Sequence, residues 1–304
     1  MCSVAVRRFT ALIVTFLGAS AAASPARSQG APLAGVAEAM GRSGAEQPAG
    51  VLRFSFPRSD LTVVADSVTL KPAFALGSWI AFQPVGPGAA VAMGDLVLTE
   101  DEVGPVMRAL QAGGVEQTAL HNHLLHETPH VMYVHVAAHG DPVKIAQTIR
   151  AALAQSRTPT GTPAAPAAAS AADLDTAAIA RTLGVSGKLN GVVYQVSVPR
   201  RERIMERGHE IPPSMGVATA INFQPIGGGR AVITGDFVMR AEEVNRVIRA
   251  LQAGGITPTG LHSHMLEESP RLFFMHFWGR DDAATLAKGL RAALDQTASK
   301  LAAK

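Results

Sequence analysis

The chain has 304 residues, and its 47% hydrophobic and 17% charged content is that of a globular protein. This length is enough for two ordinary domains with their own cores, and the composition excludes a fibrous or wholly disordered chain. The formal net charge of +3 equals the charge of Arg7, Arg8 and Arg27, the only charged residues before Glu38. The rest of the chain is formally neutral, so we expect no nucleic-acid partner.

Residues 1–30 read as an export signal peptide. Arg7 and Arg8 form a basic start, a short apolar core follows, and Ala21-Ala22-Ala23 offers a cleavage site of small residues. The core is well below the ~20 residues that a membrane-spanning helix needs. We therefore expect a periplasmic or secreted protein with no integral membrane segment after cleavage. Cys2 is the only cysteine and precedes the apolar core, so we expect neither lipidation nor a disulfide.

An internal repeat organises the rest of the chain. From Phe82 onward the two halves align without a gap at an offset of 141 residues, so that Gly94-Asp95 matches Gly235-Asp236. Pro57-Arg58 and Pro199-Arg200 align after a shift of one residue. We predict repeat domains at 33–155 and 174–299, joined by a Pro/Ala-rich linker at 156–173 that cannot bury a core.

The predicted elements follow the same order in both repeats. Thr99 and Glu102 form a capping box at the start of the clearest helix, and Gly113-Gly114 ends it. The pattern predicts an α+β domain, duplicated in tandem, with a largely antiparallel sheet and helices packed on one face. The predicted ranges are an opening helix at 34–40 and 173–183, a strand at 51–56 and 192–198, a strand or hairpin at 60–70, two strands around a turn at 79–83 and 90–98 and at 219–224 and 231–239, the capped helix, two strands that carry histidines, and a closing helix at 142–155 and 283–297.

Nine of the ten histidines lie in or just after two matching stretches, 120–135 and 261–276. The matching positions are His, His, Glu, Pro and His at identical spacing. Imidazole is the commonest protein ligand for transition metals and titrates near neutral pH. The candidate ligands are His121, His123, Glu127 and His135 in the first repeat, and His262, His264, Glu268 and His276 in the second.

The spacing predicts a two-stranded hairpin that gathers these side chains. Side chains alternate along a strand, so His121 and His123 point to the same face. With Glu127-Thr128-Pro129 as the turn, the register that pairs His123 with His135 brings three imidazoles together with Glu127 at the rim. The same register in the second repeat pairs His264 with His276. We thus expect one site in each repeat.

Three imidazoles and one carboxylate suit a divalent transition metal. Zinc is the first expectation, held tetrahedrally at ~2.0–2.2 Å, and iron, manganese and copper also accept these ligands. If the glutamates bind the metal, each site is closed. If they do not, a position stays open, and Glu127 and Glu268 are candidate catalytic bases acting on bound water.

Other polar residues receive a structural interpretation. His126, His130 and His139 have no histidine counterparts in the second repeat, so we expect them on the surface. Asp95 and Asp236 each follow a glycine at the end of a predicted strand, and we interpret them as turn or cap residues.

The run 94–103, the run 119–129 and the following His135, Gly140 and Asp141 resemble the LppY/LpqO family of exported bacterial proteins. The resemblance covers nearly the whole chain after the signal peptide, in both repeats. It implies export and a duplicated domain but supplies no activity. The chain departs from lipoprotein members of that family because it lacks the lipobox cysteine.

These observations favour an exported two-repeat protein that binds a transition metal through its histidine hairpins. A metal-dependent hydrolase or another metalloenzyme remains an alternative, as does a module that binds an anionic or sugar ligand between the repeats without a metal. A third alternative is a structural envelope protein. A small-molecule ligand and contact between the repeats are the expected interactions.

Overall fold

The structure is a computed structural model that describes residue 1, residues 33–161 and residues 173–301. The predicted signal peptide and most of the predicted linker lie outside these residues. Both repeats fall within one compact unit of the chain. Over the described ranges, no helix has the length and apolar character needed to cross a membrane.

The elements of the first repeat follow the predicted order. The predicted hairpin at 60–70 forms two very short strands, and a short helix precedes the long central strands. The bounds are α1 (Val36–Met40), β1 (Ala45–Gln47), η1 (Pro48–Gly50), β2 (Val51–Pro57), β3 (Val64–Ala65), β4 (Val68–Thr69), α2 (Pro72–Ala75), β5 (Gly77–Gly86), β6 (Ala89–Thr99), α3 (Glu100–Ala112), β7 (Glu116–His121), β8 (Val131–Gly140) and α4 (Pro142–Leu153).

The second repeat has the same order with small local differences. Its bounds are α5 (Thr176–Leu183), β9 (Lys188–Asn190), β10 (Val193–Pro199), β11 (Met205–Glu206), β12 (His209–Glu210), η2 (Pro213–Met215), β13 (Ala218–Gly227), β14 (Arg230–Met239), α6 (Ala241–Ala253), β15 (Thr257–His262), β16 (Glu268–Ser269), β17 (Phe273–Asp282) and α7 (Ala283–Leu294).

Each repeat builds one six-stranded sheet. The strand orders are β1-β2-β5-β6-β8-β7 in the first repeat and β15-β17-β14-β13-β10-β9 in the second. All the strand pairs in both sheets are antiparallel. The predicted class, a tandem duplication of an α+β domain with antiparallel sheets, is confirmed.

A buried ion pair anchors the start of the capped helix. The Glu102 carboxylate accepts a hydrogen bond from the backbone N–H of Thr99 at 3.0 Å, as the capping box predicted. The same carboxylate lies 2.7 Å from Nη1 of Arg58, a side chain with no exposed surface. Arg200 and Glu243 repeat this pair at 2.7 Å. The repeated Pro-Arg dipeptide therefore ties the end of β2 to the start of α3 in the first repeat. In the second repeat it ties the end of β10 to the start of α6.

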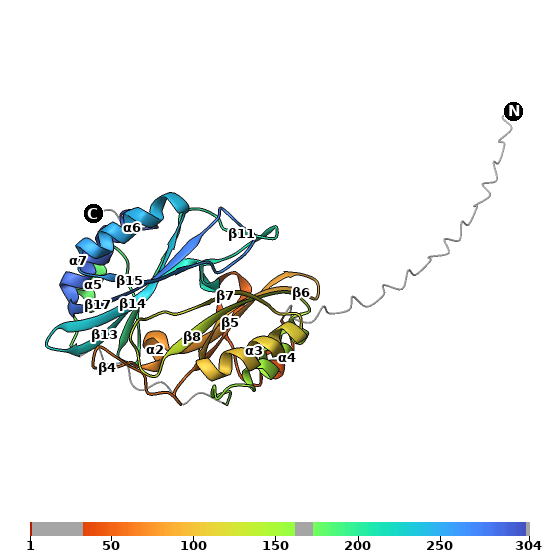
Figure 1. The fold of residues 1–304 in the computed structure, drawn as a ribbon. Helices are drawn as coiled ribbons and strands as arrows, with labels where there is room; N and C mark the ends of the chain where they lie inside the picture. Colours follow the sequence, from red (N-terminus) through yellow and green to blue (C-terminus); the bar gives the residue numbers. More distant parts are fainter. Residues whose placement is uncertain (2–32, 162–172, 302–304) are drawn as a thin grey trace. The chain divides into compact units, whose positions relative to one another are not determined.

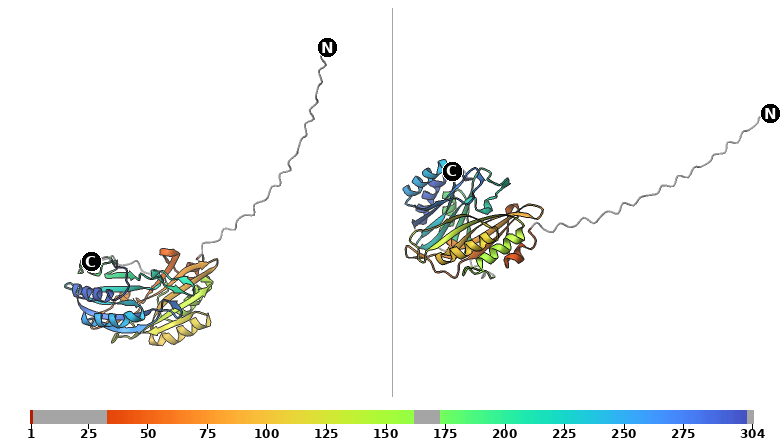
Figure 2. Two further views of the ribbon diagram at one scale, coloured as in Figure 1. Left: turned by 90° about the horizontal axis from the view of Figure 1, so that it is seen from above. Right: turned by 45° about the vertical axis from the view of Figure 1, so that its right-hand side comes forward.

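The two sheets pack against each other through their inner faces. Helices α3 and α4 cover the outer face of the first sheet, and α5, α6 and α7 cover that of the second (Figures 1 and 2). Two further clusters combine side chains of both repeats. In one of them Met93 packs with Met215 and Phe274, and in the other Tyr133 packs with Val232. The histidine segments lie between these clusters.

The hairpin register differs from the predicted one. β7 ends at His121, which pairs with Tyr133, and His135 pairs with Ala119 instead of His123. The second repeat shows the same difference, because His262 pairs with Phe274 and His276 with Gly260. His123 and His264 therefore lie beyond the strand ends. The reason is that the following residues pair elsewhere, Thr128 with Val64 and Glu268 with Glu206, so no tight turn closes the hairpin.

Candidate metal centre

Six histidines from the two repeats meet in one cluster, where one site in each repeat was expected. His121 and His262 stack with ring centroids 3.8 Å apart. Two further close pairs also join the repeats, at centroid distances of 3.7 Å and 3.8 Å. The members of these pairs are His123 with His276 and His135 with His264. The structure thus brings together all six histidines singled out in the sequence.

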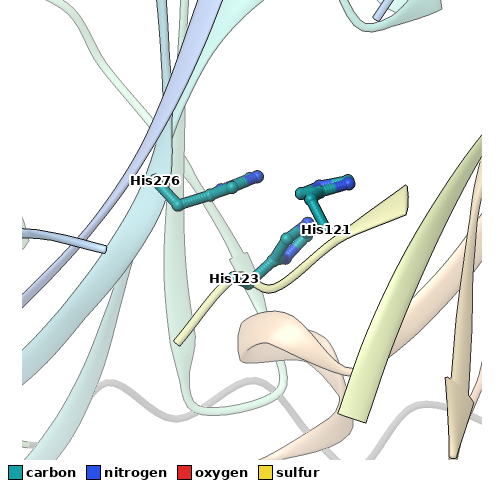
Figure 3. A group of neighbouring side chains, drawn as sticks. All are labelled: His121, His123 and His276. Atoms are coloured by element: carbon teal, nitrogen blue, oxygen red, sulfur yellow. The ribbon is translucent and has the colours of Figure 1, made fainter. Parts of the chain in front are cut away.

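Three groups of side chains in this cluster have the geometry of potential metal ligands. In the first group the ligand atoms of His121, His123 and His276 lie within 4.8 Å of one another. Figure 3 shows His121 and His123 extending from one segment toward His276 on the facing strand. The other groups are His121, His135 and His262, and Asp236, His262 and His276. Two of the three groups combine ligands from both repeats.

Backbone carbonyls orient the histidines of the central strands. The Nδ1–H of His135 on β8 donates to the carbonyl oxygen of Gly94 at 3.2 Å, and that of His276 on β17 donates to Gly235 at 2.9 Å. A carbonyl oxygen can only accept, so Nδ1 carries the hydrogen in both rings. Nε2 of each ring therefore carries a lone pair, and an Nδ1–H held by a backbone carbonyl is the arrangement typical of metal-ligating histidines.

Two aspartates that the sequence did not predict as site residues also line the cluster. Asp95 and Asp236 lie within β6 and β14 and do not end them, which corrects the turn or cap interpretation. Oδ2 of Asp95 lies 3.3 Å from Nε2 of His123, and Oδ2 of Asp236 lies 2.9 Å from Nε2 of His264. The sequence signal that could have identified these aspartates is the Gly-Asp dipeptide, which occurs in both repeats. In the structure Asp95 pairs across the sheet with His135.

Burial favours the neutral form of His121, His123, His135, His262 and His276. It lowers the pKa of His121 to about 2, with the charges of His276 and His264 as further causes. Burial also lowers the pKa of His123, His135, His262 and His276, again as the largest cause. Burial and the charge of Asp236 raise the pKa of Asp95 well above its usual range. Neutral imidazoles have the lone pairs that a metal requires.

Several buried nitrogens and oxygens in the cluster have no hydrogen-bond partner among the described residues. Native proteins leave few buried polar atoms unpaired, because each one costs about 1–3 kcal/mol. Here they gather in one place, in a cluster whose histidines could hold a metal ion. The atoms are Nδ1 and Nε2 of His121, Nε2 of His123, Nδ1 of His262, Nε2 of His264, Nε2 of His276, and Oδ1 of both Asp95 and Asp236.

Each repeat positions the histidine loop of the other. The Thr118 hydroxyl on β7 donates to the carbonyl oxygen of His264 at 2.6 Å. The equivalent Thr259 hydroxyl on β15 donates to the carbonyl oxygen of His123. β7 and β15 are also in contact. The loop conformation of each repeat therefore depends on the presence of the other.

Glu127 and Glu268 lie outside the three ligand groups. Oε1 of Glu268 accepts from the backbone N–H of Leu272 at 2.9 Å, and Oε2 lies 3.2 Å from Nη1 of Arg271. Oε1 of Glu127 lies 3.5 Å from the backbone nitrogen of Val131. Both carboxylates thus brace the return of the loop into β8 or β17. His126, His130 and His139 are exposed, as predicted.

The duplicated domain and its shared histidine cluster define a two-repeat α+β protein with a potential metal centre. The family described as Domain of Unknown Function (DUF1259) matches residues 34–155 and again residues 177–296. The chain belongs to this family, and it contains two copies of the domain. A comparison with curated proteins finds no match.

Solved structures show only distant similarity. The trimeric bacterial microcompartment shell protein PduB is 14% identical, with 83% of this chain and 90% of that chain covered and a TM-score of 0.20. EtuB from Clostridium kluyveri is 10% identical, with 86% and 95% covered and a TM-score of 0.19. TM-scores this low carry no inference about this chain.

Proposed function

We propose that the protein binds a transition metal at one centre shared by its two repeats. The observation that carries the proposal is the convergence of unpaired, buried imidazole nitrogens from both repeats. The Nδ1–H of His264 donates to the carbonyl oxygen of Gly216. Nε2 of the same ring lies 2.9 Å from Oδ2 of Asp236. A cation bound beside these two groups would accept electron pairs from both.

The spacing of the potential ligands fits a metal ion. Neighbouring donors around a tetrahedral zinc, each at ~2.0–2.1 Å from the ion, are about 3.3 Å from each other. Nε2 of His135 and Nε2 of His262 lie 3.3 Å apart. Nε2 of His123 and Oδ2 of Asp95 are also 3.3 Å apart. Zinc is the metal we propose first, and iron, manganese and copper share the preference for imidazole.

The proposed ligands are drawn from the six histidines, with Asp95 and Asp236 beside them. Glu127 and Glu268 then position the loops and do not act as bases, because their carboxylates bond to the loop backbone or to a neighbouring side chain. Export to the periplasm or beyond the cell and membership of the LppY/LpqO group belong to the same proposal. They are supported by the basic and apolar N-terminal sequence and by the repeated histidine motif.

Metal content tests the proposal. The untagged protein is reconstituted with zinc, iron, manganese or copper, and bound metal is measured by plasma mass spectrometry. We expect His121→Ala and His262→Ala each to remove more than half of the bound metal, because both residues belong to groups that cross the repeat boundary. His139→Ala is the matched control, since His139 is exposed and outside the cluster.

Two outcomes would contradict the proposal. No bound metal after reconstitution with all four ions would exclude a metal centre. A loss of half the metal in each single variant, with the other half retained at full affinity, would show two independent sites and exclude a shared centre.

A further inference from the structure

The two halves of the centre carry different side chains at one pair of equivalent strand positions, Arg53 and Gln195. Arg53 on β2 pairs with Ala81, and Gln195 on β10 pairs with Asn222, which is the equivalent of Ala81. Both side chains reach a backbone carbonyl of the other repeat. Arg53 Nη1 donates to Ser214 at 2.7 Å, and Gln195 Nε2 donates to Ala73 at 2.8 Å. The shared role therefore needs only a neutral donor.

Arg53 brings a charge that this shared role does not use. Its guanidinium lies over the Trp79 ring, 3.8 Å from the ring centroid. Within the described residues, no carboxylate oxygen lies within 4.0 Å of its guanidinium nitrogens, whereas Arg58 and Arg200 each form ion pairs with two carboxylates. Burial lowers the pKa of Arg53 to about 10, and the charge of Asp95 opposes this shift. A half-buried cation without a close counter-ion gains stability when an anion joins it.

A second polar group without a partner accompanies Arg53. The Ser214 Oγ is buried and has no hydrogen-bond partner among the described residues. Its equivalent in the first repeat, opposite Gln195, is Ala73. The polar pair Arg53 and Ser214 at one end of the centre thus replaces a neutral pair at the other end.

Trp79 connects this polar pair to the histidines. It pairs with Asp95 across β5 and β6, and Asp95 lies beside His123. Its ring also borders the other repeat, because a Cβ on Gly216 would lie 2.9 Å from Trp79 Cη2 and 3.7 Å from His264 Nδ1. Arg53 therefore stacks on the ring that borders Gly216, the residue whose carbonyl oxygen accepts from His264.

We propose that Arg53 and Ser214 form an oxyanion subsite beside the histidine centre. The subsite binds a carboxylate or phosphate group of the small molecule that occupies the metal centre, and it makes the two halves of the centre chemically different. A guanidinium and a hydroxyl are suitable donors for such a group. The inference rests on the proposed metal-binding function.

The test uses the untagged, zinc-loaded protein and two probes, inorganic phosphate and acetate, titrated by calorimetry with metal content measured in every sample. Arg53→Gln introduces the residue that the second repeat uses and keeps the carbonyl contact. We expect it to weaken binding of the preferred probe by roughly tenfold or more, and Ser214→Ala by roughly threefold or more. Arg53→Lys keeps the charge, and its affinity should lie between those of the wild type and Arg53→Gln.

Arg203→Gln is the matched control, because Arg203 is an exposed arginine paired with Glu210 on the surface. It should leave both metal content and anion affinity unchanged. The inference is overturned if neither probe binds, or if Arg53→Gln binds as tightly as the wild type at equal metal content. In both cases the metal centre itself stands. A protein without bound metal would instead refute the proposed function and this inference together.

Discussion

Nε2 of His135 and Nε2 of His262 lie 3.3 Å apart although 127 residues separate them in the chain. His135 already donates its Nδ1–H to Gly94, so its Nε2 faces His262 as an acceptor. This contact joins the two repeats inside the histidine cluster. The histidine cluster is therefore complete only when both repeats contribute to it, and the following predictions depend on this coupling.

The stability of the metal-free protein should depend on pH. The ordinary histidine pKa of 6.5 applies to the unfolded chain, and burial lowers that of His121 to about 2 in the folded state. Between these values the unfolded state binds the proton and the folded state does not, so stability is complete above pH 6.5 and falls as the pH drops toward 2.

Each such histidine contributes a slope of about 1.4 kcal/mol per pH unit. Urea unfolding of the metal-free protein between pH 8 and pH 5, measured by circular dichroism, checks this expectation. His121→Asn should reduce the slope by about one proton. A midpoint that does not change across this range would show that the cluster is not buried as described.

The reciprocal threonine contacts should control both stability and metal affinity. Thr118→Val removes the hydroxyl that holds the carbonyl oxygen of His264. We expect a loss of about 1 kcal/mol in the free energy of unfolding and a roughly tenfold weaker metal affinity, because groups that orient metal ligands have effects of this size. Thr259→Val should act in the same way on the loop of His123.

Thr128→Val serves as the control for these variants, since Thr128 is exposed in the same loop. Competition titration with a chromogenic chelator measures the metal affinity. Equal affinities for Thr118→Val and Thr128→Val would refute a positioning role for the cross-repeat hydrogen bonds.

The buried ion pair of Arg58 should be worth far more than a surface pair. Arg58→Met removes the partner at 2.7 Å and leaves the buried Glu102 carboxylate with only Arg157, 3.4 Å away, as a cation, so we expect a loss of about 3 kcal/mol. Arg203→Met breaks the exposed pair with Glu210 and should cost less than about 1 kcal/mol. Chemical denaturation of both variants provides the comparison, and similar losses would show that burial does not decide the effect.

The glycines whose carbonyl oxygens accept from His135 and His276 should not tolerate a side chain. A Cβ on Gly94 would lie 2.4 Å from the carbonyl oxygen of Trp79, and one on Gly235 would lie 2.0 Å from that of Ala220. We expect Gly94→Ala and Gly235→Ala to lose more than about 2 kcal/mol of stability and to weaken metal binding, because β6 or β14 must move.

Gly104 inside α3 provides a control, because its replacement by alanine should change stability in the opposite direction. A Cβ there would meet only the flexible end of Arg108 at 3.3 Å. Gly104→Ala should raise stability by up to about 1 kcal/mol, because alanine favours a helix. A stabilising effect of Gly235→Ala in thermal unfolding would contradict the close approach of β13 and β14.

Local patterns in the sequence determined much of the fold. The offset of 141 residues revealed the duplication, and the capping residues Thr99 and Glu102 located the start of α3. A repeat is found by comparing the chain with itself, and a capping box depends on residues three positions apart. Both signals can therefore be recognised without a structure. The histidines were predicted as site residues because their spacing is the same in the two copies.

Only the tertiary structure decided how the histidines combine. Hairpin register depends on strand partners distant in sequence, and the pairing of Thr128 with Val64 draws the loop away from the turn that local spacing predicts. The role of Asp95 is visible only once β6 lies beside β8. The sharing of one centre by both repeats follows from the packing of two apolar sheet faces, and no periodicity within a single repeat encodes that contact.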